Sequence, residues 1–248
     1  MIDYHPYDVR ISGETEVNAH NIERIEANCQ GKTTIRFVTM GDSQRWYDET
    51  EDFVKEINKR NDIDFVIHGG DMSDFGLTKE FLWQRDIMNG LNVPYVVLIG
   101  NHDCLGTGAE TYKAVFGPTN FSFIAGNVKF VCLNTNALEY DYSEPVPNFT
   151  FMEQEITSRL DEFEKTVISM HARPYTDVFN DNVAKVFQHY IRQYPGIQVC
   201  TAAHTHHYQD DVIFDDGIHY VTSDCMDYRT YLVFTITPEK YEYELVKY

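Results

Sequence analysis

Residues 98–104 read LIGNHDC, and this stretch joins an apolar run to three polar side chains in a row. The apolar run stops at Gly100, and Asn101, His102 and Asp103 follow without a spacer. Glycine and asparagine often punctuate loops, so these residues alone fit a simple turn as well as a functional site. The rest of the sequence has to decide between the two interpretations.

The apolar segments of the chain alternate with amphipathic ones. Early strands followed by helices indicate parallel βαβ units, and the later strands look more antiparallel. We therefore expect an α/β fold with two sheets packed face to face and helices outside. The predicted strands are 34–40, 64–68, 94–99, 128–133, 166–170, 197–202, 218–223, 230–236 and 241–247, and the predicted helices are 18–30, 49–60, 78–89, 150–164 and 178–194. The longest expected loop is 139–149.

The expected domain organisation is simple. Residues 1–30 precede the first strong strand and are expected to form an N-terminal extension, whereas residues 31–248 form a single domain. We find no internal repeat, linker or low-complexity tract in the chain.

Polar residues follow the carboxyl ends of five predicted strands. That edge is where α/β sheets bind ligands, so we expect these side chains to converge. They are Asp42 and Gln44 after the first strand, Asp71 and Asp74 after the second, Asn101, His102 and Asp103 after the third, His171 after 166–170, and His204 and His206 after 197–202.

This set of side chains points to metal ions. Four carboxylates in one cleft would repel each other and could not all stay ionised without cations. Imidazoles combined with carboxylates and amide oxygens, without thiolates, favour Mn, Fe or Zn over Ca or Mg. The candidates are too many for one tetrahedral ion with an open position. They suit two divalent ions about 3.5–4 Å apart that share one bridging carboxylate.

The ordered motifs GD-x-Q, GGDMSD, GNHD, a single His and AHTH resemble the calcineurin-like metallophosphoesterase superfamily. The superfamily pattern is D-x-H, GD-x-x-D, GNH-D/E, H and GH-x-H, and the matching motifs run from residue 41 to residue 206. The resemblance implies a four-layer αββα sandwich made of two mixed sheets with helices outside. It also implies a dimetal hydrolase of phosphomonoesters or small phosphodiesters.

The same resemblance implies a role for each motif residue. The nucleophile would be a hydroxide that bridges the two metals, and His102 would be the general acid, oriented by Asp74. The implied metal ligands are Asp42, Gln44 and His206 for the first ion, Asp71 for both ions, and Asn101, His171 and His204 for the second ion.

Two positions depart from the superfamily pattern. Gln44 stands where a histidine ligand is usual, and an amide oxygen binds metal more weakly than an imidazole. Phe75 stands where the protein-phosphatase branch has a phosphate-binding arginine. Arg45 or Arg173 could bind the substrate phosphate in its place, although neither lies at the motif position.

The charge composition of the chain limits which classes of binding partner are expected. The 248 residues include 20 Lys and Arg against 39 Asp and Glu, a net charge of -19 that disfavours nucleic acid and anionic membranes. We expect a small phosphorylated substrate; the alternatives are a nuclease of the same superfamily and a non-catalytic metal-binding scaffold. The oligomeric state is left open.

Other features concern the compartment. No apolar stretch reaches the 18 residues or so that a membrane span needs, and the N-terminus has no signal-peptide pattern. A cytoplasmic location is therefore expected, or export if a leader has been removed. The 5 cysteines form no CxxC motif, which favours buried free thiols.

Overall fold

The apolar segments form two mixed sheets in the computed structural model, which describes residues 5, 7–140 and 143–248. One sheet has five strands in the order β11-β10-β1-β2-β3. Strands β1, β2 and β3 are parallel, and β10 and β11 are antiparallel to their neighbours. Their bounds are Ile35–Met40 (β1), Phe65–His68 (β2), Tyr95–Val97 (β3), Thr230–Ile236 (β10) and Tyr241–Lys247 (β11).

The second sheet has six strands in the order β4-β5-β6-β7-β9-β8. Strands β5, β6, β7 and β9 are parallel, whereas β4 and β8 pair antiparallel at the two edges. Their bounds are Phe121–Ala125 (β4), Val128–Leu133 (β5), Lys165–Met170 (β6), Ile197–Ala202 (β7), Gln209–Asp211 (β8) and Tyr220–Thr222 (β9).

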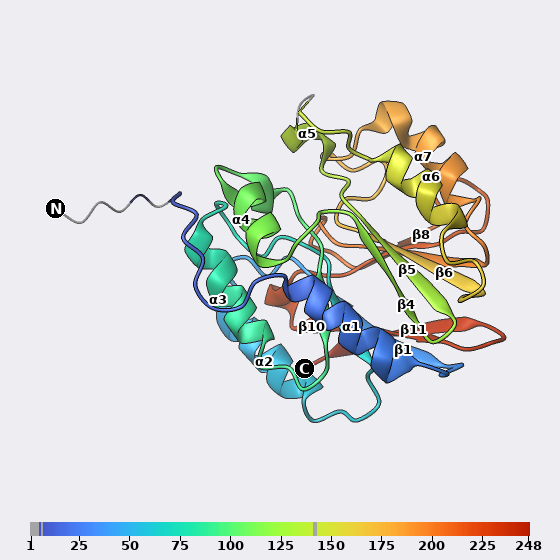
Figure 1. Ribbon diagram of the computed structural model, residues 1–248, viewed down its shortest axis with the longest axis horizontal. Coiled ribbons are helices and arrows are strands. Elements are labelled where there is room, and N and C mark those ends of the chain that lie inside the picture. The colour runs from blue at the N-terminus through green and yellow to red at the C-terminus, as the bar shows by residue number, and fades with distance from the viewer. Residues whose placement is uncertain (1–4, 6, 141–142) are drawn as a thin grey trace.

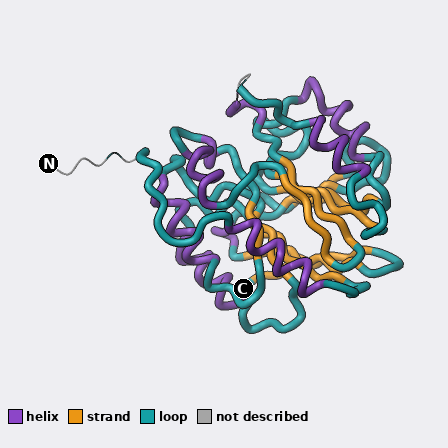
Figure 2. Tube along the Cα trace, viewed as in Figure 1, coloured by secondary structure: helices purple, strands orange, loops and turns teal. Residues whose placement is uncertain are grey.

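Helices cover the outer faces of both sheets. Figure 1 shows α2 and α3 on one side of the pair of sheets and α6 and α7 on the other, and Figure 2 shows the strands between these helical layers. The expected αββα sandwich is therefore confirmed. The helices are α1 (Val17–Cys29), α2 (Tyr47–Ile57), α3 (Thr78–Met88), α4 (Gly108–Val115), α5 (Ala137–Tyr140), α6 (Phe149–Thr157) and α7 (Ala184–Ile191), with 3₁₀ turns at His102–Cys104, Asp181–Val183 and Met226–Tyr228.

The core between the sheets is rich in phenylalanine. Successive side chains of a strand point to opposite faces, so β1 sends Phe37 between the sheets and Val38 toward the outer helices. Phe37 stacks on Phe65 and Phe234 and meets Phe130 of the opposite sheet edge-on at a ring-centroid distance of 4.9 Å. This packing fixes how the two sheets face each other, and so how their carboxyl ends meet.

Helix α1 packs along strands β3 and β4, which are edge strands of the two different sheets. Val17 and Ile25 are fully buried there. The side-chain amide of Asn18 takes the place of a neighbouring strand: its Nδ2 donates to the carbonyl of Val97 at 2.9 Å, and its Oδ1 accepts from the Val97 N–H at 2.9 Å. Residues 1–4 and 6 of the expected extension lie outside the described residues.

Several elements differ from the sequence-based prediction. Strands β4 and β8 and helices α4 and α5 were not predicted, and α5 occupies the start of the expected loop 139–149, of which residues 141–142 lie outside the described residues. The predicted helices 150–164 and 178–194 are shorter in the structure: α6 ends at Thr157, and α7 begins only at Ala184. Asn148 caps the start of α6 by accepting the main-chain N–H of Phe151. Asn180 caps the 3₁₀ turn Asp181–Val183, which precedes α7.

Two further findings concern the described residues. No helix is long and apolar enough to cross a membrane. All five cysteines are free, and four are buried.

We predict that Asn18→Leu destabilises the protein by about 1–3 kcal/mol, because it leaves the buried N–H of Val97 without an acceptor, whereas the Val97 carbonyl keeps the hydroxyl of Tyr112 as a donor. Urea unfolding followed by circular dichroism measures the change. Asn28→Leu on the exposed side of the same helix is the control. Equal stability of the two variants would show that Asn18 does not support the edge of β3.

Candidate metal centre

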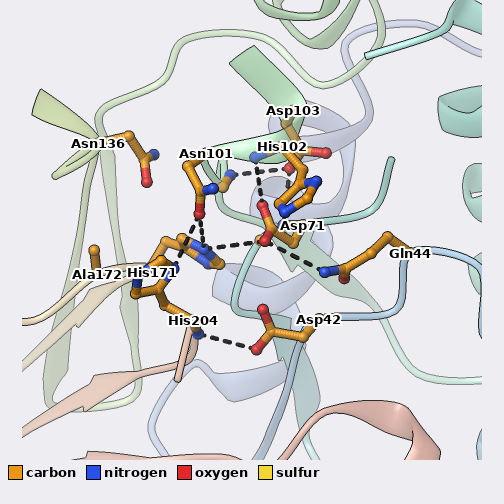
Figure 3. Close-up of polar contacts among 12 residues, drawn as sticks. Asp42, Gln44, Asp71, Asn101, His102, Asp103, Asn136, His171, Ala172 and His204 are labelled. Carbon is orange, nitrogen blue, oxygen red and sulfur yellow. Dashed lines mark hydrogen bonds and ion pairs between the residues drawn. The ribbon is translucent and has the colours of Figure 1, made fainter. Parts of the chain in front are cut away.

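The carboxyl ends of five parallel strands meet at one edge of the sandwich, as the sequence predicted. Strands β1, β2 and β3 come from one sheet, and β6 and β7 come from the other. A bridge between Gly41 and Cys225 joins the two sheets beside this edge. Figure 3 shows the side chains that follow these strands pointing toward one another. Asp42, Gln44, Asp71, Asn101, His171, His204 and His206 all lie here, joined by the contacts described below.

One group of acceptors surrounds the amide oxygen of Asn101. His171 Nε2 and His204 Nδ1 each lie 3.0 Å from Asn101 Oδ1, and His171 Nε2 lies 3.4 Å from Asp71 Oδ2. The other nitrogen of His171, Nδ1, lies 2.8 Å from the carbonyl of Gly69, which can only accept. In neutral His171 the hydrogen therefore sits on Nδ1, and the Nε2 lone pair faces the oxygens of Asn101 and Asp71. Lone pairs that converge in this way fit a cation.

A second group of acceptors lies on the other side of Asp71. His206 Nε2 is 3.4 Å from Asp42 Oδ1 and 3.4 Å from the Gln44 amide nitrogen, which is itself 3.5 Å from Asp71 Oδ2. Asp42 Oδ1 and Gln44 Oε1 are buried without any hydrogen-bond partner. Such unpaired buried oxygens are costly in a native protein and call for an ion or a water. A half-turn of the Gln44 amide would direct its oxygen into the group.

These two groups share Asp71. One ligand atom from each of Asp71, His171 and His204 lies within 4.8 Å of the others, and the same holds for Asp42, Asp71 and His206. Two groups with one common carboxylate have the composition of a two-metal site, and the donor set of carboxylate, imidazole and amide oxygen fits divalent transition-metal ions.

A proton on His171 offsets the negative charge when no metal is bound. Burial lowers the pKa of His171, but the charge of Asp71 and its hydrogen bond outweigh burial and raise that pKa to about 9. The opposite holds at His204, where burial and the neighbouring His171 lower the pKa. The close contact of its Nε2 with the Asp42 carboxylate raises the pKa of His206. The centre thus attracts positive charge, which either a proton or a metal ion can supply.

The carboxylate of Asp103 ties the ends of β2 and β3 together. It is fully buried, and its two oxygens accept from the N–H groups of Asp71, Ser73 and Gly100 at 2.8–2.9 Å and from the Ser73 hydroxyl at 3.0 Å. Gly100 is needed at this junction, since a Cβ there would lie 2.1 Å from Asp71 Oδ1. The consecutive polar residues therefore have different roles. Asn101 belongs to the first acceptor group, and Asp103 joins the loops that follow β2 and β3.

His102 lies beside the two acceptor groups. Its main-chain N–H donates to Asp71 Oδ1 at 2.9 Å, and its Nδ1 lies 2.8 Å from the main-chain carbonyl of Asp74. The Asp74 carboxylate is 3.7 Å from the same Nδ1 and forms an ion pair with Arg45, whose side chain is 60% exposed. Asp74 thus orients His102 through its carbonyl oxygen, whereas its carboxylate holds Arg45 at the surface.

The expected crowding of four carboxylates is not observed. Asp42 and Asp71 belong to the acceptor groups, but Asp103 binds main-chain N–H groups and Asp74 pairs with Arg45. The expected substrate-binding residue Arg173 donates to Gln209 and Asp211 of β8 at 2.7 and 2.8 Å. Contacts with other groups thus hold the side chains of Asp103, Asp74 and Arg173 outside the two acceptor groups.

The backbone of the site is strained. Among the described residues, ten non-glycine residues have a positive φ, and five of them are Asp42, Arg45, Asp71, His204 and His206. Side-chain sterics disfavour that conformation, and such residues persist only where the surroundings enforce them, often at functional sites.

One contact of the site was missed by sequence analysis. Asp177 Oδ1 lies 2.6 Å from His204 Nε2, although Asp177 belongs to no motif and follows His171 in the chain. No sequence signal marks it, because an exposed aspartate between Thr176 and Val178 looks like an ordinary loop residue.

The comparisons with known proteins agree with this geometry. A family model described as calcineurin-like phosphoesterase matches residues 35–208. A search of curated proteins finds no match.

Solved structures share the fold at low sequence identity. A dimetal phosphatase from Danio rerio aligns with a TM-score of 0.67 and 11% identity over 87% of this chain and 98% of that chain. GAP50, the anchor in the inner membrane complex of Plasmodium, gives 0.66 and 11% over 87% and 85%. A purple acid phosphatase from yellow lupin (Lupinus luteus) seeds gives 0.64 and 14% over 88% of this chain and 52% of that chain. At such identities these likenesses show the fold alone.

We predict that Asp103→Asn lowers the free energy of unfolding by about 1–3 kcal/mol, because the new amide nitrogen would face main-chain N–H donors that need an acceptor. Chemical denaturation measures the loss. Asp161→Asn, which neutralises an exposed carboxylate, is the control. A variant as stable as the wild type would show that the loops do not depend on the Asp103 carboxylate.

Proposed function

Because the chain belongs to the calcineurin-like phosphoesterase family, we propose that it is a dimetal hydrolase of small phosphomonoesters or phosphodiesters. The observation that carries the proposal is the pair of acceptor groups that share Asp71 and leave two buried oxygens unpaired. Unpaired buried oxygens are costly, and bound cations would give these two a partner.

The proposed ligands follow from the two groups. Mixed oxygen and nitrogen ligands favour Mn, Fe or Zn. The first ion would be held by Asp42, Gln44, His206 and Asp71, and the second by Asp71, Asn101, His171 and His204. Divalent ions in such a pair of sites supply a nucleophile at neutral pH and offset the charge of the phosphoryl oxygens.

His102 is the proposed general acid. The carbonyl of Asp74 accepts the Nδ1 hydrogen, so the exchangeable proton of the ring is the one on Nε2. In the imidazolium form this proton can pass to the oxygen of the leaving group. The negative charge of Asp74, at 3.7 Å, supports the charged ring.

Arg45 is the better supported of the two proposed phosphate-binding residues. Its guanidinium is exposed and is held beside His102 by the Asp74 carboxylate. A planar guanidinium suits bidentate contacts to phosphate oxygens. Arg173 would first have to leave Gln209 and Asp211.

The alternatives fit less well. A nuclease needs positive surface charge to hold the phosphate backbone, and the chain has a net charge of -19. A non-catalytic scaffold has one supporting observation, because GAP50, which shares this fold, is an anchor in the inner membrane complex of Plasmodium. However, a scaffold has no need for the oriented imidazole of His102 beside the acceptor groups.

Metal analysis together with turnover tests the proposal. We expect two divalent ions per chain after loading with Mn or Zn, and hydrolysis of p-nitrophenyl phosphate or bis-p-nitrophenyl phosphate. Asp71→Asn should lose both the metal and the activity, since it removes the shared carboxylate. Bound metal without turnover of either ester would favour the scaffold, and absence of metal would overturn the proposal.

We predict that His102→Asn slows the hydrolysis of an alkyl phosphate by about 100- to 10,000-fold, the usual contribution of a general acid, while the metal content stays unchanged. The aryl ester p-nitrophenyl phosphate, whose leaving group needs no proton, should lose much less rate. Steady-state kinetics with both esters measure the difference. An equal loss on both would contradict the proton-donor role.

A further inference from the structure

His204 is held by two different partners through its two ring nitrogens. Nδ1 lies 3.0 Å from Asn101 Oδ1, and Nε2 lies 2.6 Å from Asp177 Oδ1. Asp177 belongs to the connection between β6 and α7, not to a strand end, and its side chain is 87% exposed. The contact therefore joins a surface carboxylate to a buried acceptor group.

The carboxylate decides which nitrogen of His204 carries the hydrogen. An ionised Asp177 can only accept, so the neutral ring carries its hydrogen on Nε2. The Nδ1 lone pair then faces the lone pairs of Asn101 Oδ1, and these two acceptors repel unless a cation lies between them. This tautomer is the one that can bind a metal ion.

The opposite tautomer would block the second site. A hydrogen on Nδ1 could be donated to Asn101 Oδ1 at the observed 3.0 Å, and this bond would occupy two proposed ligand atoms at once. At His171 the main-chain carbonyl of Gly69 accepts the Nδ1 hydrogen and so disfavours the tautomer that would place the hydrogen on the metal-facing Nε2. His204 has no main-chain acceptor at its outer nitrogen among the described contacts, and Asp177 takes that place.

The segment that carries Asp177 is built to hold it there. The Tyr175 N–H donates to Asp181 Oδ1 at 3.0 Å, and the Thr176 hydroxyl donates to the Arg173 carbonyl at 2.7 Å. Arg173 in turn is anchored to β8. The hydrogen bonds of Arg173 therefore help to fix the turn on which Asp177 lies.

We propose that Asp177 is a positioning residue that keeps His204 in its metal-binding tautomer and so sets the affinity of the second site. The inference rests on the proposed dimetal function. Carboxylates that orient metal-binding histidines typically contribute 10- to 100-fold to metal affinity.

Calorimetric titration of the metal-free protein with Zn or Mn tests the proposal. The Asp177→Asn variant should bind the second ion 10- to 100-fold more weakly and the first ion as before. Asp181→Asn is the matched control, because it removes the same charge from the same segment while its amide oxygen can still accept from Tyr175. It should bind both ions like the wild type.

A second measurement needs no metal. Long-range proton–nitrogen correlation spectra report the tautomer of each histidine, and we expect the hydrogen of His204 on Nε2 in the wild type and partly on Nδ1 in Asp177→Asn. An unchanged tautomer together with unchanged second-site affinity would overturn the proposal. A wild type that binds no metal would instead overturn the proposed function, so the two failures are distinguishable.

Discussion

The buried carboxylate of Asp103 is the contact on which the rest of the site depends. It gathers three main-chain N–H groups and one hydroxyl from the loops after β2 and β3, and it thereby sets the distance between Asp71 and Asn101. Gly100 lets the loops approach to a separation that any side chain would prevent. The left-handed backbone at Asp71 is held by the same bonds. Without this junction, neither acceptor group would keep its shape.

The negative charge of Asp71 is shared by both acceptor groups. It is almost fully buried and faces His171 on one side and the Gln44 amide on the other. Burial raises the pKa of its carboxyl, but the charge of His171 outweighs burial, and the net result is a lowered pKa. His171, together with the main-chain N–H of His102, therefore favours the ionised form of this buried carboxyl. A proton on His171 supplies the positive charge in the free protein, and a divalent ion would supply it more strongly.

Much of this architecture was predictable from sequence, because each strand end carries its own signal. The apolar runs identified β1, β2, β5, β6, β7 and β10, and the polar residues after them identified the edge where they meet. Strand β8 could not be predicted, since Gln209–Asp211 is polar and forms a strand only by pairing with β9. Helix α4 was not predicted, because its eight residues follow closely on the GNHD motif and form only a short helix.

The differences between the expected and the observed contacts at the site have a common physical origin. Sequence patterns show which residues arrive at the edge, but hydrogen-bond geometry decides what each one does there. Asp74 was expected to act through its carboxylate, yet its carbonyl is nearer to His102, since the carboxylate is attracted by Arg45. Arg173 was expected at the substrate, yet two acceptors on an unpredicted strand hold it. Asp177 reaches His204 from a loop that no motif includes. The ligand atoms come from strand ends, which local sequence determines, whereas the groups that orient them come from tertiary contacts between distant segments. Prediction from motifs is therefore stronger for the identity of the ligands than for the residues that hold them in place.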